Sequence, residues 1–217
     1  MAKKIAAAVV VLVLLGVILV FAPVFTVREV TVRGTTTLSE QVVVDAAGVP
    51  VGDNLLRLDA AGIAQRVVQI PRVREATVKR RLPSTVAIDV VERKVVAWID
   101  TGSTVLVDDR GETFADPIDA GPPPDAMRIE GVAPDDAELL SKAVEVIAAL
   151  AEQDVAQHID HLSIHGPAEF VLHVRNGSTF IWGAPEDNRN KALAAQTLLG
   201  QESGQWNISD PTMVTRR

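Results

Sequence analysis

The 217-residue sequence contains no cysteine and no tyrosine, and aromatic residues make up only 4% of it. The absence of cysteine excludes a disulfide scaffold, a thiolate metal site and a cysteine nucleophile. Basic residues are the scarcer charged class, with 21 against 28 acidic residues, and the net charge of −7 argues against nucleic acid as the main partner. The length leaves room for a membrane anchor and one large or two small domains, which argues against a multidomain enzyme.

The motifs of common enzyme classes are also missing. No glycine-rich phosphate loop, GxSxG elbow or HExxH zinc motif occurs. His158, His161 and His165 resemble a metal cluster, but on a strand His161 and His165 would lie about 13 Å apart, so exposed sheet histidines are the favoured interpretation. The acidic residues of 100–136 could include a catalytic pair, although turns and a helix start already explain them. We therefore expect no catalytic residue, no cofactor and no metal site.

A long apolar run stands near the N-terminus, where Ile5 to Phe25 hold 21 residues without a charge. A helix of this length, rising about 1.5 Å per residue, matches a hydrocarbon core of about 30 Å. A cleaved signal peptide is the alternative, but the run is longer than the usual apolar region of a signal peptide. Pro23 also follows the best cleavage site, and proline there disfavours cleavage. We expect a single transmembrane helix over 5–25, a short cytoplasmic tail over 1–4 and an extracytoplasmic C-terminal region.

Charge divides the rest of the chain into two unlike parts. Residues 28–94 hold 11 basic and 8 acidic residues, a net of +3, whereas residues 95–217 hold 8 basic and 20 acidic residues, a net of −12. This shift predicts a domain boundary near residue 95. Part of the excess of basic residues comes from Arg72, Arg74, Lys79, Arg80 and Arg81. Because no aromatics interleave this run, we interpret it as a solvated strand face, or as one that meets anionic headgroups or an acidic partner.

The first part, residues 26–94, reads as a compact α+β unit of order β-α-α-β-β. Alternating β-branched residues predict a strand before Gly34, and Ser39 and Asp59 are candidate caps for two helices that end at Gly48 and near Gln69. Strands are expected over 73–82 and 85–93. Two helices are then expected to cover one face of a three-stranded sheet.

The second part, residues 95–217, is predicted to be a mixed β-rich domain with two helices. Asn176-Gly177 is a strong hairpin signal between strands expected over 169–175 and 178–182. Helices are expected up to about Gln153 and over 187–199. The N-glycosylation patterns that begin at Asn176 and Asn207 fall where asparagine serves as a turn or edge residue, and such short motifs recur by chance.

The last predicted strand runs from Trp206 to Ser209 and stops before Pro211, which places it at a sheet edge. Trp206 and Ile208 alternate with Asn207 and Ser209, so two apolar side chains would accompany unpaired backbone groups available to an extended partner segment. The alternative is that Trp206 and Ile208 cap the domain's own core.

Several spaced motifs resemble one family, the bacterial cell-division protein FtsQ or DivIB. The single apolar anchor is followed by Val27-x-x-Val30-x-Val32-x-Gly34, and the most specific stretch runs from Pro71-x-Val73 to Glu92-Arg93. The ending Ile208-Ser209-Asp210-Pro211 resembles actinobacterial members. Leu82 and Val95 depart from the pattern, since many members have tryptophan and proline at these positions.

The resemblance implies that residues 26–94 form a POTRA domain and that residues 95–217 form the family's β domain with its C-terminal edge strand. It further implies a non-catalytic divisome scaffold at the division septum that binds FtsB-like and FtsL-like single-span proteins and helps to control the septal peptidoglycan synthase. Glu75, Thr77 and Lys79, facing outward on the second strand, are a possible recruitment face. The alternatives are a POTRA-containing assembly or translocation factor and a membrane-anchored hydrolase.

Overall fold

The computed structural model describes residues 5, 9–11, 25–115 and 121–216, and these form two compact units, residues 1–92 and 93–217. Most of the expected transmembrane helix therefore lies outside the described residues, although Ile5 and 9–11 are helical. Within the described part of the chain, no helix has both the length and the apolarity needed to cross a bilayer. The division between the units falls between Glu92 and Arg93, two residues before the expected domain limit.

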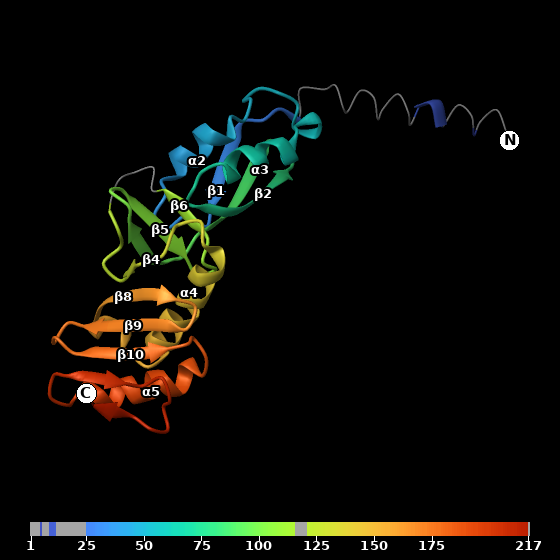
Figure 1. Ribbon diagram of the computed structural model, residues 1–217. Coiled ribbons are helices and arrows are strands. Elements are labelled where there is room, and N and C mark those ends of the chain that lie inside the picture. The colour runs from blue at the N-terminus through green and yellow to red at the C-terminus, as the bar shows by residue number, and fades with distance from the viewer. Residues whose placement is uncertain (1–4, 6–8, 12–24, 116–120, 217) are drawn as a thin grey trace. The chain divides into compact units, whose positions relative to one another are not determined.

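Unit 1 has the order β-α-α-β-β that the sequence predicts, with one extra 3-10 turn (Figure 1). Its sheet has the order β1-β3-β2, in which β1 and β3 are parallel and β2 and β3 are antiparallel. The elements are β1 (Glu29–Arg33), α2 (Glu40–Ala47), η2 (Leu55–Arg57), α3 (Ala60–Val68), β2 (Val73–Arg81) and β3 (Thr85–Glu92).

Local signals fix the helices of unit 1. The Ser39 side chain accepts a hydrogen bond from the backbone of Val42, and Gly48 ends α2 in the left-handed conformation. Asp59 caps α3 by accepting from Gly62. Both helices pack onto the sheet around a core that includes Ile63 and Ile88. Phe25, expected as the last residue of the membrane anchor, instead packs against this core.

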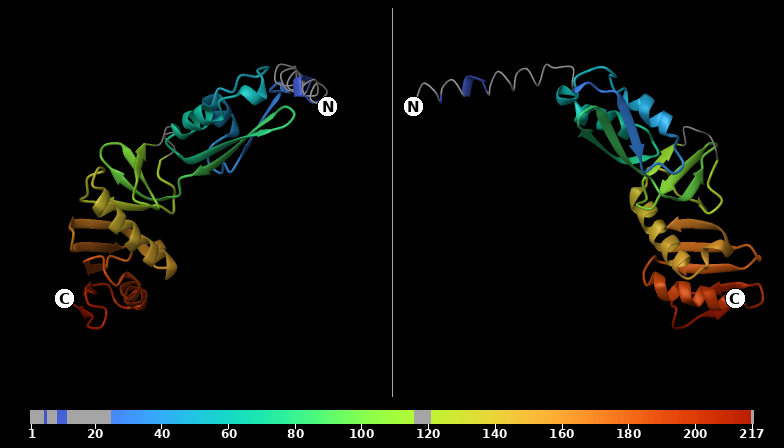
Figure 2. Two further views of the ribbon diagram at one scale, coloured as in Figure 1. Left: turned by 90° about the vertical axis from the view of Figure 1, so that its right-hand side faces the viewer. Right: turned by 180° about the vertical axis from the view of Figure 1, so that it is seen from behind.

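Unit 2 is a nine-stranded mixed sheet of order β12-β11-β10-β9-β8-β7-β4-β5-β6. The helices α4 and α5 pack on one face of it, and the views from opposite sides in Figures 1 and 2 show this face and the uncovered one. The elements are β4 (Val95–Asp100), β5 (Thr104–Asp108), β6 (Thr113–Ala115), β7 (Met127–Glu130), α4 (Ala137–Glu152), η3 (Ala156–His158), β8 (Ile159–Gly166), β9 (Glu169–Val174), β10 (Thr179–Gly183), α5 (Asn188–Leu198), β11 (Gln205–Asn207) and β12 (Thr215–Arg216).

The core of unit 2 lies between the two helices and the sheet. Its largest fully buried side chains include Trp182, Phe170 and Phe180, together with Leu140 and Leu150 of α4. On α4, Leu140, Val144 and Ile147 are buried, whereas Ala151 is exposed.

Candidate protein-binding edges

The end of the unit 2 sheet is built one strand further out than the sequence predicts. Strand β11 covers Gln205–Asn207, so Ile208 and Ser209 lie beyond it. It pairs in parallel with β10 and antiparallel with β12, with Trp206 opposite Arg216 and Asn207 opposite Thr215. The expectation that Trp206–Ser209 form the sheet edge is thus wrong about position: β12 is the outermost described strand, and both backbone edges of β11 face a neighbour.

Each of the four residues expected to bind a partner makes contacts within the chain itself. Ile208 is fully buried in the unit 2 core, and its backbone N–H donates to Ile181. Trp206 is half-buried against the same core. The Asn207 side chain accepts a hydrogen bond from the backbone of Ser209, 3.0 Å away, and turns the chain after β11. For Ile208, the alternative interpretation as a core residue is confirmed.

Arg216 holds the outer strand in place, and sequence reasoning missed it. Its guanidinium lies 5.3 Å from the centre of the Trp206 ring, donates to the carbonyl of Ser203 at 3.1 Å and pairs with Glu202 at 3.4 Å. A cation over an aromatic face is attractive even at an exposed site. β-branched Val214 and Thr215 are the local signal that could have indicated this strand.

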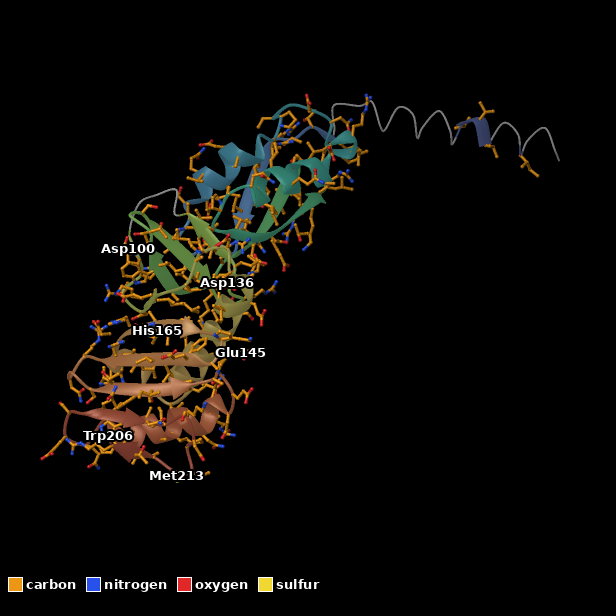
Figure 3. All side chains as sticks on the ribbon, viewed as in Figure 1. Asp100, Asp136, Glu145, His165, Trp206 and Met213 are labelled. Atoms are coloured by element: carbon orange, nitrogen blue, oxygen red, sulfur yellow. The ribbon has the colours of Figure 1, made fainter. Side chains whose placement is uncertain are left out.

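The segment between β11 and β12 is a structured turn. Asp210 accepts hydrogen bonds from the hydroxyl and the backbone N–H of Thr212, and these bonds hold the pKa of Asp210 below its ordinary value. Pro211 and Thr212 border a hollow of about 320 Å³ whose other wall is α5, including Leu193. Figure 3 shows Trp206 and Met213 at this end of the unit, and Met213 is 68% exposed. The turn that leads into the outer strand therefore carries an exposed apolar side chain, Met213.

The second candidate edge is β2, an outermost strand of the unit 1 sheet. The expected recruitment residues Glu75, Thr77 and Lys79 are all exposed on it. Lys79 donates to Asp89 of β3 at 2.8 Å, and this hydrogen bond lowers the pKa of Asp89. Ala76 and Val78 alternate with these residues and pack against the core, so the exposed residues lie on the sheet face away from the helices.

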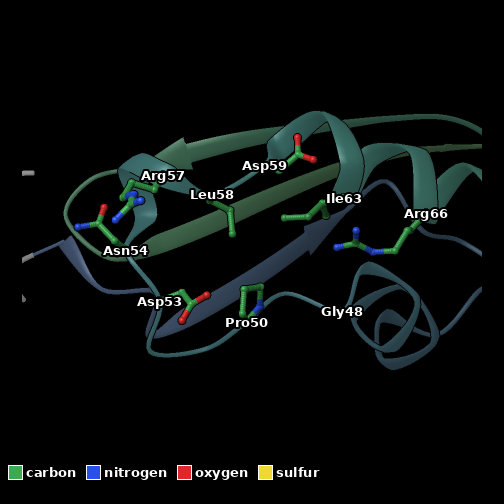
Figure 4. A pocket seen from close by; sticks show the side chains of 9 residues that line it. All are labelled: Gly48, Pro50, Asp53, Asn54, Arg57, Leu58, Asp59, Ile63 and Arg66. Carbon is green, nitrogen blue, oxygen red and sulfur yellow. The ribbon is translucent and has the colours of Figure 1, made fainter. Parts of the chain in front are cut away.

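A hollow of about 570 Å³ in unit 1 lies between α3 and the loop that follows α2 (Figure 4). Three of its polar side chains have local partners: Arg66 donates to the carbonyl of Ala47 at 2.6 Å, Asp59 caps α3, and Asn54 accepts from the backbone of Leu56. These bonds stabilise the loop, and their geometry resembles capping rather than acid–base chemistry.

Two histidines of unit 2 are brought together by the register of neighbouring strands and not by their spacing along the chain. His161 of β8 lies opposite His173 of β9, and their rings stack with centroids 4.1 Å apart. Asp160 contacts His161 at 2.8 Å. Burial, followed by the nearby His161, lowers the pKa of His173, while Glu130 and Asp160 act in the opposite direction. Among the residues that the structure describes, no three potential ligands are grouped closely enough to hold a metal ion.

The carboxyl groups with altered pKa values also favour structural roles. Those of Asp89, Glu92, Asp160 and Asp210 are all lowered, through bonds to neighbouring donors that in Glu92 outweigh burial. A general acid at neutral pH needs a raised carboxyl pKa. These four groups therefore fit capping and ion pairing and give no support to the hydrolase alternative.

Comparison with known proteins agrees with the architecture. A family model described as POTRA domain, FtsQ-type, matches residues 25–93. The cell division protein FtsQ of Corynebacterium glutamicum is 32% identical over 212 residues, which cover 96% of this chain and 94% of that protein. The chain belongs to the FtsQ family. Unit 1 is thus its POTRA domain, and the sequence resemblance to this family is confirmed.

Two further FtsQ relatives are longer than this chain. FtsQ of Mycobacteroides abscessus is 34% identical over 93% of the chain and 64% of that protein. FtsQ of Mycolicibacterium smegmatis is 34% identical over 93% of the chain and 60% of that protein. The chain therefore spans less than two thirds of these two relatives. Membership in the family supports a cell-division protein over the assembly-factor alternative.

Proposed function

We propose that the chain is a non-catalytic divisome scaffold that links early and late division proteins and helps to control septal peptidoglycan synthesis. It would be anchored by the apolar segment 5–24 with the N-terminus cytoplasmic and unit 2 outside, at the septum. The single observation that carries the proposal is the outermost two-residue strand β12 at the end of a nine-stranded sheet. Membership in a cell-division family supports it.

The binding mode follows from the sheet's hydrogen bonding. An outer strand presents a row of N–H and C=O groups that an extended segment can pair with. Because β11 is paired on both sides, we place the partner on β12 rather than on Trp206–Ser209. Both residues of β12 are exposed, and Met213, two residues before the strand, offers an exposed apolar side chain. An FtsB-like segment, with FtsL as its companion, is the partner that the family resemblance suggests.

The test separates backbone pairing from side-chain contact. The variant T215P removes the backbone N–H of Thr215, whereas T215A keeps this N–H and removes only the side chain, and both variants leave Arg216 in place. We expect the proline variant to bind an FtsB-like extracytoplasmic segment at least about 10-fold more weakly, a loss of about 1.4 kcal/mol, and T215A to bind nearly as well as the unaltered chain. Equal binding by all three proteins would contradict the proposed edge, provided that circular dichroism shows unit 2 intact.

Depletion tests the cellular role directly. If the chain is a divisome scaffold, cells that lose it should become filamentous or branched and fail to divide. Complementation with T215A should restore division, and complementation with T215P should not. Normal division in depleted cells would count against a required scaffold role.

The exposed face of β2 is proposed as a separate recruitment site. The variant K79E reverses a charge and breaks the ion pair with Asp89, while K79E/D89K keeps an ion pair of exchanged polarity. Because exposed pairs contribute only about 0–1 kcal/mol, both variants should remain folded. We expect both to show weaker septal fluorescence of a tagged chain. Undiminished septal localisation in both would remove this face from consideration.

A further inference from the structure

Three backbone segments meet at one end of unit 1, and we name this end the proximal tip: residues 26–28, 51–54 and 81–84. Val27 donates to the carbonyl of Asp53 at 2.8 Å, and Gly52 donates back to Val27 at 2.8 Å. Arg28 donates to the carbonyl of Ser84 at 2.9 Å. The start of the domain and two loop ends are therefore joined at the same place by main-chain hydrogen bonds.

Among residues 25–92, the proximal tip carries the two most exposed large apolar side chains. Val51 is 70% exposed and Leu82 is 61% exposed, each at the end of a loop. Single exposed apolar residues are common and need no explanation. Here two of them share one end of the domain with the point where the chain enters it. A surface that takes apolar side chains beside charged ones is the interface of a bilayer.

The charge at the proximal tip is mainly basic. Arg28 and Arg81 are exposed on it, beside Arg57 and Arg80. Figure 4 shows Arg57 and Asn54 at the same end of the unit 1 pocket. Within the three segments that define the tip, the charged residues are Arg28 and Arg81 against the single carboxylate of Asp53. Basic residues close to a bilayer are attracted to anionic lipid headgroups.

Chain length decides between a membrane and an acidic protein as the partner. Phe25 already packs against the unit 1 core, and it directly follows the apolar segment 5–24. Since an extended residue spans at most about 3.6 Å, residues 26–28 lie within roughly 15 Å of the end of the predicted membrane helix. A membrane surface is thus within reach of the proximal tip without any rearrangement.

We propose that the proximal tip lies on the extracytoplasmic surface of the bilayer. Leu82 and Val51 would enter the interface, and Arg28 and Arg81 would contact anionic headgroup phosphates. This rests on the membrane anchoring in the proposed function, but not on partner binding. The contact would fix the orientation of the POTRA domain against the lipid rather than leave it free on its tether. Its occupant is a bilayer that contains an anionic phospholipid.

The absence of native cysteine makes a site-specific test possible in the full chain. The variants L82C, V51C and V91C would each carry an environment-sensitive nitrobenzoxadiazole label, with the chain reconstituted in vesicles of phosphatidylcholine with or without phosphatidylglycerol. Val91 is the matched control. It is also exposed, but it lies near the C-terminal end of β3, whereas the proximal tip adjoins the N-terminal end of that strand. We expect labels at 82 and 51, but not at 91, to shift to shorter wavelength and to be quenched by lipid-attached quenchers in the anionic vesicles.

Charge reversal supplies the second measurement. In R28E/R81E carrying the label at 82, the ratio of lipid-bound to free tip should fall about 30-fold, or roughly fivefold for each arginine lost. Unchanged circular dichroism would show that the variant remains folded.

Three results would overturn the proposal. A label at 82 that stays in water in both kinds of vesicle excludes the contact, and equal burial in both excludes the role of anionic headgroups. Shielding that needs an added division protein assigns the tip to a protein partner. A chain that fails to remain with the vesicles would refute the anchor as well, whereas an anchored chain with a water-exposed tip would refute this inference alone.

Discussion

The carboxylate of Glu92 should be a main stabilising group of the POTRA domain. It lies at the end of β3 and accepts hydrogen bonds from the backbone of Thr36 at 2.6 Å, Thr37 at 3.0 Å and Leu38 at 3.0 Å, and from the Thr36 hydroxyl at 3.0 Å. The segment between β1 and α2 is thereby held against β3. Partial burial opposes ionisation of Glu92, but these bonds outweigh it and hold its pKa below the ordinary value of 4.5.

The substitution E92A removes every one of these bonds at once. A hydrogen bond to a charged group contributes about 1.5–3 kcal/mol in mutational series. Because Glu92 is half-exposed and water can replace it at the freed N–H groups, we expect a net loss of about 2 kcal/mol rather than the sum. With a urea dependence of about 1 kcal/mol/M for a domain of this size, the midpoint of unit 1 should fall by about 2 M. E92Q, which keeps an acceptor oxygen, should lose about half as much.

The distribution of tryptophan lets the two units be followed separately. Trp98, Trp182 and Trp206 all lie in unit 2, and the chain has no tyrosine. Tryptophan fluorescence therefore reports the unfolding of unit 2, whereas far-ultraviolet circular dichroism reports both units. E92A should shift a circular dichroism transition and leave the fluorescence transition in place. The exposed residue Glu75 provides the control, since E75A should shift neither.

The pH dependence gives an independent check of the same reasoning. A group whose pKa is lowered in the folded state adds stability above its unfolded value, and this contribution is lost as the pH falls through the folded value. The difference between the unaltered chain and E92A should therefore be full at neutral pH and shrink below pH 4.5. A difference that is absent at neutral pH, or that is unchanged in acid, would refute the assigned role of the carboxylate.

Two further predictions concern unit 2. A Cβ at Gly183, where φ is 73°, would lie 2.8 Å from Cβ of Ser209, whereas one at Gly177, where φ is 87°, meets nothing within 4 Å. G183A should thus lose about 1–3 kcal/mol more than G177A in urea unfolding followed by fluorescence, and equal losses would exclude the steric cause. Because burial lowers the pKa of His173 below 6.5, the stability of unit 2 should fall as the pH drops through 6.5. H173Q should show a smaller fall over this range, and an identical profile would contradict it.

Local sequence signals predicted the elements that local chemistry determines. The caps at Ser39 and Asp59 and the left-handed Gly48 are confirmed, since a hydroxyl or carboxylate at a helix start and glycine at its end act within one turn. The Asn176-Gly177 hairpin is confirmed between β9 and β10. The strand expected over 85–93 is confirmed as β3 (Thr85–Glu92).

Elements defined by distant neighbours could not be predicted in this way. Strand β7 has the sequence Met-Arg-Ile-Glu, four residues whose role depends on lying between β4 and β8. Strand β12 has two polar residues and exists because β11 and Arg216 hold it. The stacking of His161 on His173 depends on the register of two strands and not on spacing along the chain. These features depend on which strands pair in the folded chain, and hydrophobic periodicity along the sequence carries no information on that pairing.

The parallel pairing of β10 with β11 determines when the outer strands of unit 2 can form. Parallel neighbours need a crossover, and here α5 supplies it, so β11 cannot dock before that helix is in place. Strand β12 in turn needs β11. A nascent chain that has finished its POTRA domain and half of the large sheet therefore lacks β12, and if a partner pairs with β12 as proposed, that pairing must wait until synthesis has passed residue 216.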